Sequence, residues 1–415
     1  RRMTSNLLAA LKSNQNKGNN QQVNSKLIDA AKSGDIQSCL QALSEPKVKV
    51  DDKDVDGTSA LMHAAIGGYL DVVKFFVQKG ARFQARDDGG ENAMMKASKE
   101  GHVSIVEYLI QAAVATPKKG QSIGEEAKEK LQILKKRTVD AKDDEGITAL
   151  MKAAEQGEEG VMRLLLDQGA SVEMKDDEGW NVLMWASLSG HLGIVEMLVK
   201  DYNMSLEYAT EKGETALMKA AANGHWDVCE YLFEEGGQSK VNYADQDHQT
   251  ALMWAAAEGH TQVVRGLISK HANVNLETHM GKTALLLAAQ FGRGDICEYL
   301  LLKKANVEHQ DLDGQSALFS AVQSGNVHLC EVLINRGCPV EAYNKRGETA
   351  IMMAALEQSV PTVQLLIEKQ AKLDCQDENM RTALDHAEST LNSQVVEILR
   401  VALRQQNLAR PASSE

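Results

Sequence analysis

The sequence predicts an all-α repeat solenoid of about eleven helix-turn-helix units. A nine-residue motif recurs ten times, beginning at Gly57, Gly90, Gly146, Gly179, Gly213, His248, Gly281, Gly314, Gly347 and Met380. The steps between copies are 33, 56, 33, 34, 35, 33, 33, 33 and 33 residues. A fixed period of this length indicates stacked supersecondary units. A second apolar-periodic run follows each motif, so every unit supplies two amphipathic helices.

Each unit makes the same physical sense. In the stretch 215–225, Leu217, Ala220 and Ala221 share one helical face, and the small alanines permit close helix approach. In the stretch 228–233, Val228 and Leu232 form the facing stripe of a second helix. One such unit cannot bury its apolar face alone, so stability should come from stacking each unit on its neighbours.

The composition is that of a folded, acidic protein. Hydrophobic residues make up 43% of the 415 residues, which excludes wholesale disorder. A net charge of −13 disfavours binding to nucleic acid phosphates. No apolar run of about 18 residues predicts a membrane span, and the N-terminal segment is not a secretory signal. The six cysteines form no CxxC pair. We therefore expect free thiols in a reducing compartment, the cytoplasm, with the nucleus left open.

The period and the motif resemble the ankyrin repeat, which has 33 residues and a TPLHxA core. Copies such as TALMKAA (215–221) are similar to the TALM-type units common in single-celled eukaryotes, with Ala or Val for the family's Pro and usually Met for its His. The resemblance implies short β-hairpin fingers and a protein–protein interaction scaffold that binds a partner on its concave face and hairpin tips. An alternative is a regulatory or substrate-recruiting arm of a larger enzyme or channel, which the full-length reading frame would reveal.

The predicted organisation covers nearly the whole chain. We expect a flexible segment over residues 1–25, a repeat domain over 26–404, and a flexible tail over 405–415. The domain should behave as a monomer. It should open with a cap over 26–50 and continue with repeats that begin near residues 54, 87, 143, 176, 210, 245, 278, 311, 344 and 377.

One insertion breaks the period between Gly90 and Gly146. It lies within 113–138 and carries seven Lys or Arg against three Glu, so it is basic in an acidic chain. The stretch 125–137 has helical propensity, with Leu131, Ile133 and Leu134 as apolar anchors. We expect it to project from the stack, either as a tolerated surface loop or as a docking element.

No catalytic, cofactor-binding or metal-binding residues are predicted. The sequence contains no GxxxxGK[ST], HExxH or GxSxG motif and no kinase signature. The histidines after the Gly turns are attributed to turn packing, namely His102, His191, His225 and His260. Four cysteines share one position of the second helix, which favours a small core residue: Cys39, Cys229, Cys297 and Cys330.

Two sets of residues are candidates for partner binding. The first is the inner-helix position that follows the Leu-Met pair, where Lys152, Trp185, Lys219 and Trp254 lie, with Trp180 nearby. The tryptophans there either wedge between helices or anchor a partner. The second set is the finger tips, which sum to −8 over the first five full repeats and 0 over the last five. Their acidic members are either merely solvated or steer a basic partner segment: Asp144, Glu145, Asp177 and Glu178.

Overall fold

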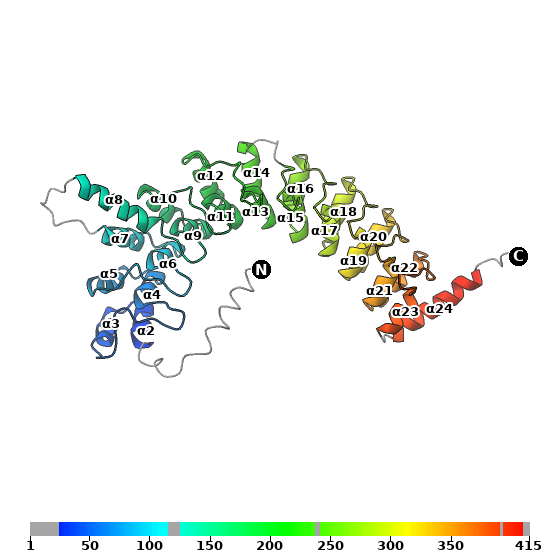
Figure 1. Cartoon of the computed structure of the whole chain (residues 1–415), viewed down its shortest axis with the longest axis horizontal. Coiled ribbons are helices and arrows are strands. Elements are labelled where there is room, and N and C mark those ends of the chain that lie inside the picture. The colour runs from blue at the N-terminus through cyan, green and yellow to red at the C-terminus, as the bar shows by residue number, and fades with distance from the viewer. Residues whose placement is uncertain (1–24, 115–124, 237–240, 391–392, 410–415) are drawn as a thin grey trace. The chain divides into compact units, whose positions relative to one another are not determined.

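The computed structural model describes residues 25–114, 125–236, 241–390 and 393–409. These ranges contain 23 helices, and 22 of them form consecutive pairs of one inner and one outer helix (Figure 1). Strand structure in the same ranges is limited to isolated bridges. The prediction of an all-helical repeat solenoid is therefore confirmed. Apart from Ser25, the predicted flexible segment 1–25 lies outside the described residues. The final helix runs to Ala409, so the predicted tail 405–415 begins within that helix, and its last residues, 410–415, are not described.

The chain divides into two compact units, here called the N-unit (Arg1–Met204) and the C-unit (Ser205–Glu415). The inner helices of the N-unit are α2 (Ser25–Ser33), α4 (Ala60–Ile66), α6 (Ala93–Lys99), α9 (Ala149–Gln156) and α11 (Val182–Ser189). Its outer helices are α3 (Ile36–Leu43), α5 (Leu70–Gln78), α7 (Val103–Ala113), α10 (Glu159–Asp167) and α12 (Leu192–Lys200). Each inner helix packs on its outer partner and on the next inner helix.

The C-unit repeats the same arrangement. Its inner helices are α13 (Ala216–Ala222), α15 (Ala251–Glu258), α17 (Ala284–Gln290), α19 (Ala317–Gln323), α21 (Ala350–Leu356) and α23 (Ala383–Ser389). Its outer helices are α14 (Trp226–Gly236), α16 (Thr261–Ser269), α18 (Gly294–Leu302), α20 (Val327–Asn335), α22 (Val360–Glu368) and α24 (Ser393–Ala409).

Each inner helix of a full repeat starts at a Ser, Thr or Asn cap. In α9 the Thr148 hydroxyl accepts a hydrogen bond from the Met151 amide at 3.3 Å, which satisfies one of the free amides of the first turn. The methionine at the third position of several inner helices also contributes. The sulfur atoms of Met62, Met253 and Met352 accept the amide of their own cap residue at 3.4, 3.5 and 3.3 Å. These sulfur contacts stay within one repeat and add to the cap of its inner helix.

The turn histidines link neighbouring repeats. Nε2 of His102, His191 and His260 lies 2.8, 3.0 and 3.0 Å from a carbonyl oxygen at the end of the preceding repeat's inner helix. This arrangement agrees with the turn-packing interpretation. It also gives these repeats a polar contact with the repeat before them.

The insertion contributes one unpaired helix, α8 (Glu125–Val139), which packs against α7. Thr138 and Val139 are buried, whereas Ile133 and Leu134 are 54% and 39% exposed. Residues 115–124 lie outside the described residues, so the prediction of a projecting insertion can be followed only for α8. None of the helices in the described part of the chain has the length and hydrophobicity that crossing a bilayer requires.

Candidate partner-binding site

The fingers of the N-unit are built around a buried aspartate. In the finger that precedes α9, Asp143 accepts the amides of Glu145 and Ile147 at 3.0 and 2.8 Å, which fixes the turn. Gly146 adopts a φ of 79°, and a Cβ atom there would collide with Asp177 of the next finger. The glycine is therefore needed both for the turn and for the close approach of the two fingers.

Neighbouring fingers are joined by backbone hydrogen bonds. The Asp88 amide donates to the Asp56 carbonyl at 3.1 Å, and the Asp177 amide donates to the Glu145 carbonyl at 3.0 Å. Asp144 donates in the same way to the carbonyl of Gly89 at 3.2 Å. These bonds hold the finger tips in a fixed row within the N-unit. The C-unit has equivalent bonds, for example from His279 to Asp247.

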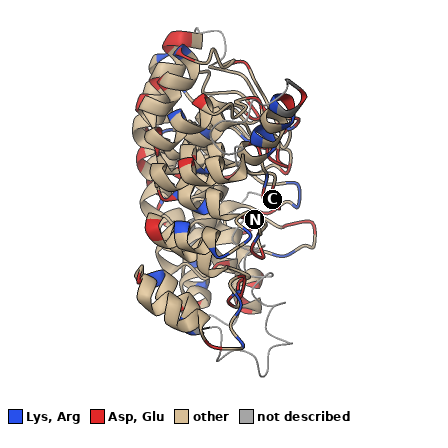
Figure 2. Cartoon of the chain, turned by 90° about the vertical axis from the view of Figure 1, so that its left-hand side faces the viewer, with Lys and Arg blue, Asp and Glu red and all other residues tan. Residues whose placement is uncertain are grey.

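The acidic residues predicted at the tips lie on the surface of this row. Asp144, Glu145, Asp177 and Glu178 are all exposed. Red acidic stretches are visible on the loops in Figure 2. A guanidinium nitrogen of Arg86 lies 4.0 Å from a carboxylate oxygen of Asp144, and both side chains are exposed. The structure thus places all four predicted tip carboxylates on adjacent fingers of one unit.

The inner-helix candidates are placed differently from the sequence argument. We call the position after the Leu-Met pair the slot position and the residue nine before it the finger-start position. In the N-unit each slot side chain folds back onto its own finger-start aspartate. The distances are 2.7 Å for His63–Asp54, 2.8 Å for Lys96–Asp87, 2.9 Å for Lys152–Asp143 and 3.1 Å for Trp185–Asp176.

Consequently three of the predicted contact residues are buried. Lys152 is 7% exposed, Trp185 is 3% exposed and Trp180 is 9% exposed. The two indole rings lie 5.4 Å apart at a tilt of 56°. The physical reason is the finger-start carboxylate, whose burial requires a donor that the slot side chain supplies. Lys152 and Trp185 thus support their fingers from beneath, and the Trp180 ring packs on Trp185.

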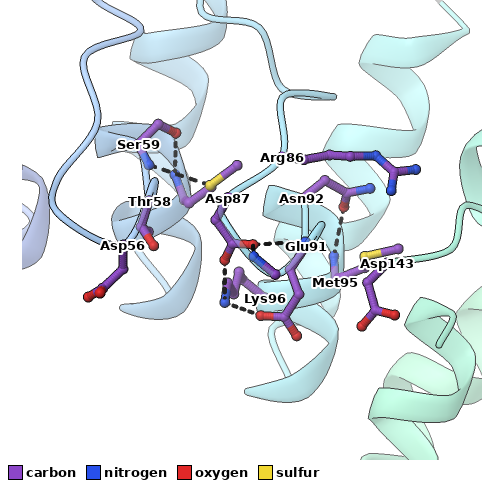
Figure 3. A network of polar contacts seen from close by, with 12 residues as sticks. Asp56, Thr58, Ser59, Arg86, Asp87, Glu91, Asn92, Met95, Lys96 and Asp143 are labelled. Carbon is purple, nitrogen blue, oxygen red and sulfur yellow. Dashed lines mark hydrogen bonds and ion pairs between the residues drawn. The ribbon is translucent and has the colours of Figure 1, made fainter. Parts of the chain in front are cut away.

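Glu91 extends this pairing from one repeat to the next. It forms ion pairs with Lys96 of its own repeat and with Lys152 of the following repeat. Figure 3 shows Lys96 between Asp87 and Glu91. Burial alone would raise the pKa of Glu91, but hydrogen bonds and charge from Lys152 and Lys96 lower it. The same contacts raise the pKa of Lys152 despite its burial. The cluster is therefore ionised on both sides at neutral pH.

In the C-unit the pairing of slot and finger-start residues is less regular. Lys219 has Thr210 at its finger-start position and instead pairs with Glu214 at 2.8 Å. Trp254 is half-buried and hydrogen-bonds Asp245, whose pKa is raised because burial outweighs its hydrogen bonds. Where the slot residue is Leu287 or Met353, the finger-start residue is uncharged, Thr278 or Asn344. The partial matching of the two positions is visible in the sequence, whereas the contact between them is visible only in the structure.

A sequence model described as ankyrin repeats (3 copies) matches residues 27–119, 122–208, 202–278, 269–344 and 318–407. The chain belongs to the ankyrin-repeat family. Ankyrin repeats are generally protein–protein interaction modules, and the family is typically non-catalytic. The chain has no match among curated protein sequences.

The ankyrin fold also explains the cysteines. Cys39, Cys229, Cys297 and Cys330 are free and fully buried at the same position of α3, α14, α18 and α20. Burial raises the pKa of Cys39 to about 11 and that of Cys297 and Cys330 to about 12. Thiols held in the protonated form in a packed stripe are poor nucleophiles, in line with the core role expected from the repeat register.

Three potential metal ligands of this ankyrin chain converge within the described residues, namely Glu348, Asp377 and His386. However, Asp377 already accepts bonds from His386 at 3.0 Å and from the Arg381 guanidinium at 3.0 and 3.1 Å. Burial raises the pKa of Asp377, but these bonds and two backbone amides outweigh it and bring the pKa to about 2. The arrangement is that of a charge-compensated finger-start aspartate.

Proposed function

We propose that this ankyrin protein is a protein–protein interaction scaffold whose N-unit fingers bind a partner through a basic segment. The observation that carries the proposal is the row of exposed carboxylates Asp144, Glu145, Asp177 and Glu178 on fingers joined by backbone hydrogen bonds. A row of like charges attracts a basic partner electrostatically. Because the fingers are already held in place, binding loses little conformational entropy in ordering them.

The remaining candidates take two roles in this proposal. Lys219 and Trp254 are partly exposed on inner helices of the C-unit and would contact the partner there, as a separate surface of that unit. Trp180, Trp185 and Lys152 act beneath the surface, since they hold the fingers in place. We further propose that the chain works as a monomeric adaptor without catalytic activity. Its free cysteines, five of which are buried, support a reducing compartment, the cytoplasm.

The test measures association with a synthetic Lys/Arg-rich peptide by stopped-flow at low and high salt. The double variant Asp144→Lys/Asp177→Lys should slow association roughly tenfold at low salt and flatten its salt dependence. A matched control is Asp313→Lys/Glu378→Lys, which reverses two exposed tip charges of the C-unit and should change the rate far less. Equal rates in the wild type and the N-unit variant would refute the proposal.

A further inference from the structure

The repeat that begins at residue 278 departs from its siblings at two surface positions. Met280 lies just before the tip glycine, where the other repeats carry Asp56, Gly89, Glu145, Glu178, Lys212, Asp247, Asp313, Arg346 and Asn379. Phe291 follows the inner helix by one residue, where the others carry Gly67, Glu100, Gln156, Ser189, Asn223, Glu258, Ser324, Glu357 and Thr390. No other repeat has an apolar side chain at either position. The fold therefore does not require them.

Both side chains are exposed and meet in one groove of the C-unit. Met280 is 54% exposed and Phe291 is 53% exposed. They line an open groove of about 440 Å³ together with Trp254 and the slot residue Leu287. The slot side chain of this repeat is apolar, so it adds to the groove floor instead of pairing with a finger-start aspartate. Exposed apolar side chains that meet in one groove, and that the fold does not require, mark a candidate binding site.

The charges around the groove select the partner. Asp247 and Glu258 line it from the preceding repeat, both are exposed, and neither forms an ion pair among the described residues. The one lysine of the lining, Lys282, donates to the side chain of Gln290 at 2.7 Å. The groove thus combines an apolar floor with two carboxylates and one ammonium group, which leaves the charged side chains of its lining net negative. A second copy of this chain would bring like charges together, because the chain carries a net charge of −13.

We propose that this groove binds a peptide segment of a partner protein in which a large apolar side chain is flanked by Lys or Arg. The apolar side chain would pack between Phe291, Met280 and Trp254, and its basic neighbour would pair with Asp247 or Glu258. This inference rests on the proposed function, because the ligand is again a partner protein with a basic segment. It adds an anchoring site that is separate from the N-unit fingers.

The test selects binders from a random peptide library displayed on phage, with the full chain as the target. Recovered peptides should combine an aromatic or large aliphatic residue with an adjacent Lys or Arg. Each synthetic peptide is then measured by isothermal titration calorimetry. The double variant Met280→Asp/Phe291→Ser carries the residues that the next repeat has at these positions, Asp313 and Ser324, so the fold should tolerate it. It should weaken binding about tenfold or more.

A matched control is Tyr343→Gln. Tyr343 is 69% exposed in the same unit, does not line the groove, and is replaced by the residue found at the equivalent Gln310. It should bind like the wild type. The inference is overturned if the recovered peptides bind the double variant as tightly, if acidic peptides dominate the selection, or if no peptide binds the groove. It is also overturned if sedimentation shows wild-type dimers that the double variant abolishes.

The finger variant Asp144→Lys/Asp177→Lys separates this inference from the proposed function. If only the groove variant weakens the selected peptides, the groove stands and the steering role of the fingers fails. If only the finger variant weakens the binding of these peptides, the fingers keep their steering role and the groove is not the binding site.

Discussion

Lys152 forms an ion pair with Glu91 of the preceding repeat, although the inserted segment separates the two repeats in the sequence. Lys152 also holds its own finger-start aspartate, Asp143, at 2.9 Å. One buried ammonium group therefore stabilises a finger and fastens it to the finger before it.

Removing this ammonium group should destabilise the N-unit strongly. Lys152→Met leaves Glu91 and Asp143 with less compensation in a buried site, and breaking such a cluster costs roughly 3 kcal/mol of unfolding free energy. Lys99→Met, at an exposed position of the neighbouring inner helix, should change it by less than about 0.5 kcal/mol. Urea denaturation followed by circular dichroism measures both. Equal urea midpoints for the two variants would contradict a stabilising role for the ion pairs of Lys152.

The two slot tryptophans should respond differently to truncation. Trp185→Ala removes a buried ring and leaves Asp176 without its indole donor, so we expect a loss of about 3–5 kcal/mol of unfolding free energy. Trp254 is half-buried and lines the groove of the C-unit. Trp254→Ala should lose less stability and weaken partner binding by about 2 kcal/mol. If Trp185→Ala kept its stability but bound the partner more weakly, Trp185 would be a partner contact and not a support of the finger.

Acid should destabilise the last repeat through Asp377. Its pKa is about 2 in the folded chain against an ordinary value of 3.8. A lowered folded-state pKa contributes stability above the unfolded value, and this contribution disappears as pH falls from about 4 to about 2. Asp377→Asn should therefore flatten the dependence of Tm on pH in this window, whereas the exposed neighbour Glu378→Gln should keep the wild-type slope. Parallel curves for the wild type and Asp377→Asn would contradict the assignment.

Deleting residues 115–137 restores the 33-residue step between Gly90 and Gly146. The deletion keeps Ala113, Thr138 and Val139, which are buried, and removes the exposed part of α8. Because that part belongs to no repeat-to-repeat contact of inner helices, Tm should shift by less than about 4 °C. Differential scanning calorimetry measures the shift. A loss comparable to the removal of a complete repeat would show that the insertion belongs to the core.

The sequence was sufficient for the repeat register, because Gly57 and its counterparts recur at nearly constant steps and all adopt the positive φ of the finger turn. It also placed Cys229 and Cys297 in the core, since a fixed position in an amphipathic helix has a fixed environment. It did not reveal that Lys152 and Trp185 fold back under their fingers. Lysine and tryptophan side chains are long enough to reach either the surface or a neighbouring carboxylate, and only the three-dimensional path of the finger decides between them. The link from Glu91 to Lys152 crosses an insertion and has no constant spacing to detect.

The pairing of slot and finger-start residues has a consequence for how such an array grows. In most units the buried carboxylate and its donor are nine residues apart in the same repeat, as with Asp54 and His63 or Asp377 and His386. A gene segment that duplicates one of these repeats copies the carboxylate together with its donor, so the new unit brings its own hydrogen-bond partner. The repeat that contains Glu91 is different, because its carboxylate also depends on Lys152 in the following repeat. Moving that repeat without its successor would leave Asp87 and Glu91 to share the single ammonium group of Lys96.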